Sequence, residues 1–291
     1  MESGGTSEQR TSDLPTQPNT SSINSDSNPN SSNNSTRFTV GLINSIGLQR
    51  EHNEDALFAM TTYLISDNSS LPFGLYILAD GMGGHAHGEK ASEVAVQAMA
   101  IGVLSKLLPA IQEGSGGDSA DNIQVIMKEG VKAAHQAIIE GAPGGGSTLT
   151  GILLLRDQMT IAHIGDSRAY AIDTHGNVNL LTTDHSLVKR LVDLGQITTD
   201  EAAIHPQRNV LYRALGQAEM VDPDLISTPI PDSGCLVLCS DGLWGVVPDD
   251  QMAHIISSAN SPQKASQTLL EAANAAGGPD NISVILIEIS N

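Results

Sequence analysis

The chain has 291 residues, of which 33 are acidic and 14 are basic, giving a formal net charge of −19. Such a surface repels phosphate backbones and anionic lipids, which argues against nucleic-acid binding and membrane attachment. Hydrophobic residues make up 40% of the chain and aromatic residues only 3%, so a large core can form and has to be aliphatic. Neither a secretory signal pattern nor an apolar run approaching ~18 residues is visible, and we expect a soluble, cytoplasmic protein.

Residues 1–36 consist almost entirely of Ser, Asn, Thr, Gly, Pro, Asp and Gln. This segment cannot bury enough apolar surface to offset its chain entropy, so we expect a disordered tail. The tail is either a tolerated extension or a segment for phosphorylation or docking. From Arg37 onward the pattern is globular without a further shift in composition, which predicts one domain over 37–291.

Strand-like and helical segments follow one another in clusters after residue 37. Strands are predicted over 38–43, 73–79, 149–155, 159–164, 169–172, 235–239 and 282–289. Helices are predicted over 88–108, 121–140, 187–194, 249–259 and 262–276, with a further helix starting at a cap near Thr198. Residues 205–232 have no regular pattern. The short turns within 149–172 predict antiparallel pairing of the three strands there.

The clustered order of these elements is typical of an α+β fold, because a parallel doubly wound sheet would alternate strands and helices strictly. We therefore expect two packed antiparallel sheets flanked by helices on both sides. The two cysteines, Cys235 and Cys239, lie four residues apart on one predicted strand. They point to the same face but too far apart for a disulfide, which favours buried thiols in a reducing compartment.

Three short motifs place an aspartate beside glycine or asparagine where an apolar run ends or begins: Asp80-Gly81 and Asp241-Gly242 follow such a run, and Asp280-Asn281 precedes one. An aspartate at a strand end suits a shared cleft better than a core. Carboxylates gathered in this way are hard oxygen ligands that suit Mg²⁺ or Mn²⁺. The pattern favours a metal-dependent hydrolase.

A fourth motif lies upstream, where Arg50 precedes the adjacent carboxylates Glu54 and Asp55. Arginine presents a planar fork of donors that matches phosphate oxygens. The alternative is a surface loop with an ordinary ion pair. The three aspartate motifs elsewhere give the phosphate interpretation its weight.

The motifs together resemble the metal-dependent serine/threonine protein phosphatases of type 2C, also called the PPM family. They are Arg50…Glu54-Asp55, Asp80-Gly81-Met82-Gly83-Gly84, Gly146-Ser147-Thr148, Gly165-Asp166-Ser167-Arg168, Ser240-Asp241-Gly242 and Asp280-Asn281. The stretch from Asp184 to Gly216 looks like the bacterial branch of the family. Any one motif is weak, but the set occurs in the family's order over residues 38–290. The resemblance implies that 37–291 is a phosphatase catalytic domain.

The resemblance also implies two Mn²⁺ or Mg²⁺ ions, held by Glu54, Asp55, Asp80, Gly81, Asp241 and Asp280. Asp80 would bridge both ions, and Asp241 and Asp280 would complete the shell of one. The Gly81 carbonyl would hold the other ion, together with Glu54 or Asp55 directly or through water. Relatives often carry an aspartate just before the Gly-Ser/Thr-Thr element, which helps to bind a third ion. Residues 141–148 contain no carboxylate, which argues against a strongly occupied third site.

The implied reaction is attack of a metal-bridging hydroxide on the phosphorus of phosphoserine or phosphothreonine, with Arg50 and Asp80 as the catalytic residues. Arg50 would clamp the phosphate oxygens. The proton for the leaving group would come from His85 or His87, or from a metal-bound water if these are loop histidines without a role. We expect structural roles for Asp166 and Arg168, a core position for Trp244, and a substrate-recognition flap at 186–215.

The leading hypothesis is therefore a phosphatase that opposes a serine/threonine kinase, acting on phosphorylated proteins as a monomer. A catalytically weak pseudophosphatase that binds phosphoproteins is the alternative, and it would be favoured by loss of a core ligand. A third reading is a different phosphoester hydrolase or a Ca²⁺-binding module, which predicts no specific role for Arg50.

Overall fold

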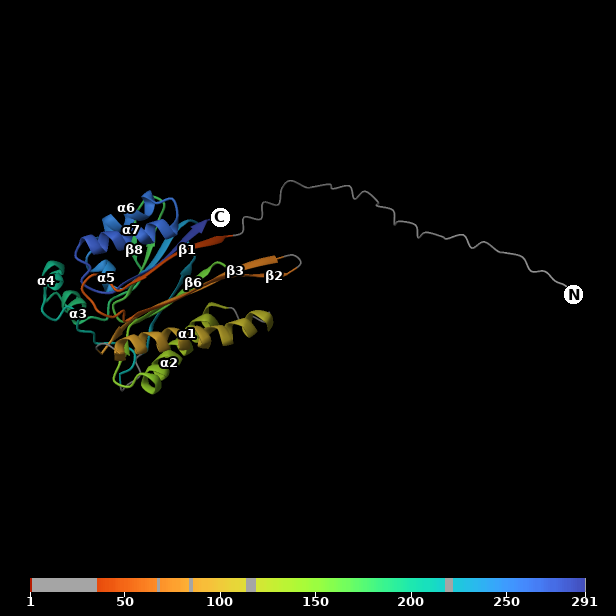
Figure 1. Cartoon of the computed structure of the whole chain (residues 1–291), viewed down its shortest axis with the longest axis horizontal. Coiled ribbons are helices and arrows are strands. Elements are labelled where there is room, and N and C mark those ends of the chain that lie inside the picture. The colour runs from red at the N-terminus through yellow and green to blue at the C-terminus, as the bar shows by residue number, and fades with distance from the viewer. Residues whose placement is uncertain (2–35, 67–68, 84–85, 114–118, 218–221, 291) are drawn as a thin grey trace. The chain divides into compact units, whose positions relative to one another are not determined.

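Two antiparallel sheets lie in the part of the chain that the computed structural model describes, which is Met1 with residues 36–66, 69–83, 86–113, 119–217 and 222–290 (Figure 1). The first sheet has the order β1-β11-β10-β7-β8, with β1 (Arg37–Ser45), β7 (Arg168–Ile172), β8 (Val178–Leu180), β10 (Gly234–Cys239) and β11 (Ile282–Ser290). The second has the order β2-β3-β5-β6-β9, with β2 (Asp55–Ser66), β3 (Ser69–Met82), β5 (Leu149–Leu155), β6 (Gln158–Ile164) and β9 (Asp224–Pro229). The two-residue strand β4 (Gly146–Ser147) pairs with the end of β3.

Three clusters of buried apolar side chains pack the layers together. One lies between the sheets, where Tyr76 and Ile152 of the second sheet pack with Leu238 and Ile285 of the first. A second cluster joins the outer face of the second sheet to α1 (Ala86–Glu113) and α2 (Ala120–Gly141). The third joins the outer face of the first sheet to α5 (Asp241–Trp244), α6 (Asp249–Ser258) and α7 (Pro262–Ala275). The predicted α+β fold, with two antiparallel sheets between helical layers, is confirmed.

Helix α1 contains one stretch, His87–Ile111, that is long and apolar enough to cross a membrane by length and composition alone. In the structure this helix packs on β2, β3 and α2, and its buried side chains belong to the core. The short helices α3 (Leu187–Asp193) and α4 (Thr199–Ala203) start at Ser186 and Thr198, whose hydroxyls accept from backbone N–H groups as N-caps. The cap predicted at Thr198 is therefore confirmed.

Two sequence-based expectations about strands were wrong. The strands β5 and β6 pair with each other, but β7 lies in the other sheet, beside β10. The crossing occurs at Gly165, whose φ of 107° turns the chain between the sheets in a conformation that favours glycine. Residues 205–232 were expected to be irregular, yet β9 extends the second sheet there, beside β6.

The sheet register brings several strand ends to one edge of the sandwich. Asp55, the first residue of β2, stands opposite Asp80 near the end of β3. Ser45, the last residue of β1, stands opposite Ile282, the first of β11. The loops that follow these ends therefore share one region. Both cysteines lie on β10 and are free; Cys239 is buried, as predicted, whereas Cys235 is only half-buried. The predicted tail lies outside the described residues apart from Met1 and Thr36.

Candidate active site

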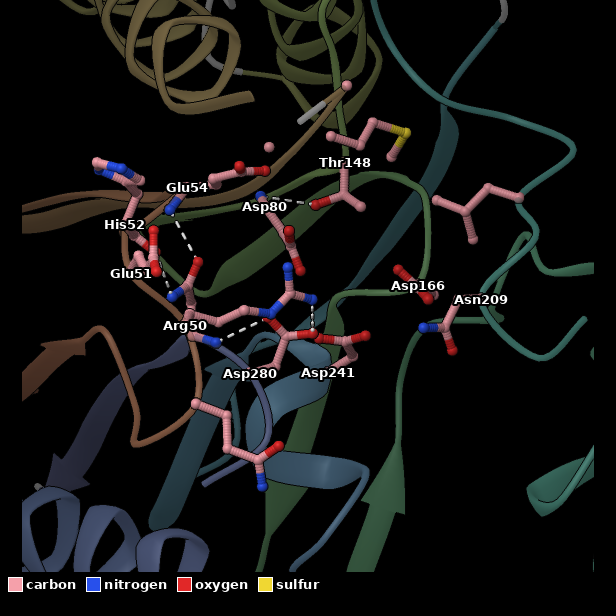
Figure 2. Close-up of a pocket in the computed structure, with 16 residues that line it drawn as sticks. Arg50, Glu51, His52, Glu54, Asp80, Thr148, Asp166, Asn209, Asp241 and Asp280 are labelled. Carbon is pink, nitrogen blue, oxygen red and sulfur yellow. Dashed lines mark hydrogen bonds and ion pairs between the residues drawn. The ribbon is translucent and has the colours of Figure 1, made fainter. Parts of the chain in front are cut away.

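The strand ends surround a pocket of about 510 Å³, which we call the carboxylate pocket (Figure 2). Its charged lining residues are Arg50, Glu51, Glu54, Asp80, Asp166, Asp241 and Asp280. Among the described residues, Arg50 is the only arginine or lysine in this lining. The pocket thus gathers oxygen ligands around a single guanidinium. Six of the predicted site residues line it: Arg50, Glu54, Asp80, Gly81, Asp241 and Asp280.

Asp80 is fixed through its backbone. Its N–H donates to Thr148 Oγ1 at 2.9 Å, and its carbonyl accepts from Thr148 N at 2.8 Å and from Ser147 Oγ at 3.0 Å. Thr148 Oγ1 lies 2.8 Å from Ser167 Oγ, which ties this strand end to the turn after β6. Burial raises the pKa of Asp80 well above its ordinary value, and the nearby carboxylates, Asp55 first among them, add to the rise.

Asp241 and Asp280 come from the first sheet. Asp241 opens the short helix α5, directly after β10 and Ser240. Desolvation raises the pKa of Asp241 to about 6, with repulsion from Asp280 as the next cause and Arg50 opposing the rise. Asp280 precedes β11 and accepts from the Arg50 guanidinium at 2.6 Å. Arg50 is thereby held at the rim of the pocket, with its side chain half-exposed.

Asn281 lines the pocket and holds its loops together, a role that the sequence did not predict beyond the motif. Its amide nitrogen donates to the carbonyls of Ile46 at 3.0 Å and His52 at 2.9 Å, and its amide oxygen accepts from Glu54 N at 2.8 Å. One buried side chain therefore fastens the loop that carries Arg50 and Glu54 to the start of β11. The signal in the sequence was an asparagine directly after an aspartate, because its amide can both donate and accept hydrogen bonds.

The structure distinguishes Glu54 from Asp55. Glu54 lines the pocket, whereas Asp55 is buried behind it and is absent from the lining. Asp55 Oδ2 accepts from Ser240 Oγ at 2.7 Å, and Asp55 Oδ1 is buried without a hydrogen-bond partner. Burial raises the pKa of Asp55 to about 7. Gly81 lies so close to its neighbours that an added Cβ would stand 2.1 Å from the Gly88 carbonyl oxygen and 2.7 Å from that of Glu54.

Asp166 lines the pocket as well, although the sequence favoured a purely structural role in the turn between strands. It lies in that turn and is buried, and burial raises its pKa to about 8, with repulsion from Asp241 as the second cause. Trp244 Nε1 donates to the Asp166 carbonyl at 3.0 Å. The Arg168 guanidinium stacks 3.6 Å over the Trp244 ring and binds both carboxylate oxygens of Asp184, at 2.9 and 2.8 Å. Trp244 packs against the outer core of the first sheet, as expected.

We expect Trp244→Phe to lower the free energy of unfolding by about 1–2 kcal/mol, because the Asp166 carbonyl loses its donor while a ring stays under Arg168. Urea denaturation measures this change. Ser257→Ala is the matched control, because it removes an exposed hydroxyl that donates to the His254 carbonyl and should change stability by less than about 0.5 kcal/mol. Equal stabilities for the two variants would contradict the proposed importance of the indole donor.

The predicted flap, residues 186–215, borders the pocket through Asn209 and Leu211. Its two ends are joined by backbone hydrogen bonds from Leu187 N to Val210 O at 2.8 Å and from Tyr212 N to His185 O at 2.9 Å. His185 Nδ1 accepts from Gly165 N at 3.1 Å, which anchors the flap to the same turn that carries Asp166. The sequence did not identify Asn209 or Leu211 individually.

The two histidines predicted as candidate general acids differ in what the structure shows of them. His87 is exposed in the first turn of α1 and does not line the carboxylate pocket. His85 lies outside the described residues. Among the described residues, His52 is the only histidine that lines the pocket, and the sequence did not predict it as a general acid.

The donor set fits divalent cations of the Mg²⁺ and Mn²⁺ class, which take oxygen ligands. The carboxylates share the pocket but stay spread out. In the described part of the chain, no three of them lie close enough together to hold a metal ion at one point. Ionised carboxylates repel one another, so this spread is expected when only an arginine offsets their charge. The raised pKa values and the unpartnered Asp55 oxygen indicate that a further positive charge would be favourable here.

Comparisons with known proteins agree with this geometry. The family model described as Protein phosphatase 2C matches residues 42–282. The serine/threonine phosphatase stp of Listeria monocytogenes is 34% identical over 248 residues, covering 83% of this chain and 92% of the relative. The S. agalactiae serine/threonine phosphatase structure is 31% identical with a TM-score of 0.71, covering 86% of this chain and 99% of that one. The catalytic domain of the phosphatase PstP, solved in complex with 2 manganese ions, is 31% identical with a TM-score of 0.67, covering 88% and 100%.

Proposed function

The chain belongs to the protein phosphatase 2C family, and we propose that it hydrolyses phosphoserine and phosphothreonine in proteins at the carboxylate pocket. The chain is a metal-dependent serine/threonine protein phosphatase by its family and its relatives. The observation that carries the location is the gathering of four aspartates around one arginine at the strand ends. Because Asp80, Asp241 and Asp280 are all present, the pseudophosphatase alternative is not favoured.

We propose that Asp80, Asp241, Asp280, Glu54 and the Gly81 carbonyl hold the ions, which are Mn²⁺ or Mg²⁺. When bound, such ions act as Lewis acids that lower the pKa of a water and offset the charge of the phosphoryl oxygens. Asp55 supports this set from behind through Ser240, which lies next to Asp241 in the chain. The hydrogen bond that Asp80 N donates to Thr148 and the one that its carbonyl accepts from Ser147 hold Asp80 in place, so its carboxylate needs little reorganisation on binding.

Arg50 is proposed to bind the substrate's phosphate. Its guanidinium is half-exposed at the rim and pairs with Asp280, so it keeps donors available for a second acceptor. Burial lowers the pKa of the Arg50 guanidinium, but the carboxylates Asp280, Asp241 and Glu54 raise it, and the net shift is upward. The pair with Asp280 orients the guanidinium toward the pocket before substrate arrives.

Arg50→Ala is expected to lower kcat/KM by about 10²-fold, because the charge that develops on the phosphoryl oxygens loses its donor. The measurement is steady-state hydrolysis of a phosphothreonine peptide in saturating Mn²⁺. Arg37→Ala is the control, since Arg37 is exposed at the opposite end of β1. An unchanged kcat/KM in Arg50→Ala would remove Arg50 from the phosphate site.

The broader biological role is also a proposal. Phosphoprotein substrates imply a serine/threonine kinase whose products the enzyme reverses, and relatives named serine/threonine phosphatases support this assignment. We propose that the protein acts in signalling as a cytoplasmic monomer. The buried, unpaired thiols and the acidic surface support this setting.

Phosphate release from a phosphothreonine peptide tests the proposed function directly. We expect release in Mn²⁺ or Mg²⁺, little in Ca²⁺ and none in EDTA. Asp241→Asn serves as the inactive control. A folded protein that releases no phosphate in any of these metals would overturn the assignment and favour a binding role.

A further inference from the structure

A second groove, with a volume of about 370 Å³, opens beside the carboxylate pocket, and Met82 and Gly83 line both. We call it the glycine groove, because five of its nine lining residues are glycines. Its lining residues are Met82, Gly83, Gly144, Gly145, Gly146, Ala214, Leu215, Gly216 and Gln217. It is therefore built from the end of β3, the loop that leads into β4 with the first residue of β4, and the end of the flap with the two residues that follow it.

The groove differs from its neighbour in charge. None of the nine described residues that line it carries a formal charge, whereas seven described residues that line the carboxylate pocket are charged. Ala214 and Leu215 are fully buried, so their contribution is the floor beneath the glycines. The side chain of Gln217, in contrast, is exposed at the edge. A charged group that entered this groove would lose hydration without finding a partner there.

Most of the glycines are required by close packing, but Gly144 is not. A Cβ added at Gly216 would stand 2.5 Å from the Gly145 carbonyl oxygen, and one at Gly146 would stand 3.1 Å from that of Leu215. A Cβ at Gly144 would meet nothing within 4 Å, and its φ is 87°. The space in front of Gly144 is thus open, and the bare backbone allows another chain to approach closely.

The walls of the groove are connected to the catalytic residues by hydrogen bonds. Strand β4 pairs with β3 through Met82 opposite Gly146 and through Gly81 opposite Ser147. Ser147 also exchanges hydrogen bonds with Leu215, at 3.2 Å and 2.8 Å. The same two residues of β4 therefore align the groove and the backbone of Asp80. A peptide held in the groove has a fixed position relative to the pocket.

We propose that the glycine groove is a specificity subsite that receives an uncharged residue next to the phosphorylated serine or threonine. Met82 and Gly83 line both cavities, so a peptide whose phosphate occupies the carboxylate pocket can extend past them into the groove, advancing ~3.3–3.6 Å per residue. The absence of charge among the described lining residues selects against Asp and Glu at that position. This inference rests on the proposed function and adds the class of sequence that the site accepts.

The test compares phosphothreonine peptides that carry Val or Asp, one position at a time, from two residues before to two residues after the phosphothreonine. At the groove position, the unsubstituted enzyme should prefer Val over Asp by about tenfold in kcat/KM, because an unpaired carboxylate is poorly tolerated in an uncharged groove. Gln217→Lys adds a cation at the groove's edge. It should raise kcat/KM for the Asp peptide at that same position by about fivefold.

Two controls separate this subsite from general effects. Gln97→Lys adds the same charge to the exposed face of α1, outside both cavities, and should leave the preference unchanged. Hydrolysis of p-nitrophenyl phosphate, which has no flanking residues, should be equal in all three proteins. Equal turnover of Val and Asp peptides at every position, or an equal effect of both lysines, would overturn the subsite while leaving the phosphatase assignment intact. Failure to hydrolyse any substrate would overturn both.

Discussion

Asp241→Asn is expected to abolish hydrolysis while making the metal-free protein more stable. The loss in kcat/KM should be about 10³-fold or more, because the carboxylate is proposed to hold an ion that acts on the reacting phosphate. In EDTA at pH 8, the same change removes one of several ionised carboxylates that repel one another in the pocket. The free energy of unfolding should therefore rise by about 1 kcal/mol.

Metal binding gives the second readout of this variant. The unsubstituted protein should gain about 2.7 kcal/mol of stability when Mn²⁺ is present at 100 times its dissociation constant. Asp241→Asn should lose most of that gain. Asp232→Asn, at an exposed loop position before β10, is the matched control and should behave as the unsubstituted protein does. Normal turnover, or an undiminished Mn²⁺-induced gain, would exclude Asp241 from the metal site, and Asp80→Asn is expected to give the same pattern.

The second large effect is a loss of stability with rising pH in the absence of metal. The pKa values of Asp241, Asp55 and Asp166 are raised from 3.8 to about 6, 7 and 8 in the folded protein. At a pH between the ordinary pKa of 3.8 and these raised values, the folded protein binds more protons than the unfolded chain does. Stability is therefore highest at low pH within this window and falls as pH rises from about 4 to 8.

We expect the free energy of unfolding in EDTA to fall by about 2–4 kcal/mol between pH 5 and pH 8, measured by urea denaturation. Saturating Mn²⁺ should reverse this dependence, because the ions favour the ionised carboxylates. Asp166→Asn should flatten the part of the profile nearest pH 8. If the free energy of unfolding without metal did not change over this pH range, burial and mutual repulsion would not raise the pKa values of these carboxylates in the folded protein.

The sequence singled out Asp80, Asp241 and Asp280, which the structure brings to one pocket, because each stands where an apolar run ends or begins, beside glycine or asparagine. Asp80 and Asp241 follow long apolar runs, and the chain cannot place such carboxylates in the core without a partner. The distinction between Glu54 and Asp55 was beyond sequence reasoning, because adjacent residues at the start of a strand point to opposite sides. Only the position of β2 against Ser240 determines which of them faces the pocket.

The errors have a common physical origin in long-range pairing. Strands β6 and β7 are separated by a short turn, and local rules favour a hairpin there. Instead, Gly165 directs the chain into the other sheet, and the turn brings Asp166 to the pocket. The same limitation explains why β9 was not predicted. It lies at the edge of the second sheet and forms by pairing with β6, which its own sequence does not indicate.

The two thiols on β10, one buried and one half-buried, separate this enzyme from phosphatases that use a cysteine nucleophile. Burial raises the pKa of Cys235 to about 11, and it raises that of Cys239 further. Neither residue lines the carboxylate pocket. Since oxidants and alkylating reagents attack the thiolate, hydrogen peroxide and iodoacetamide should leave turnover unaltered in the folded protein. Dephosphorylation by this enzyme would then continue under oxidative stress, when cysteine-dependent phosphatases are silenced.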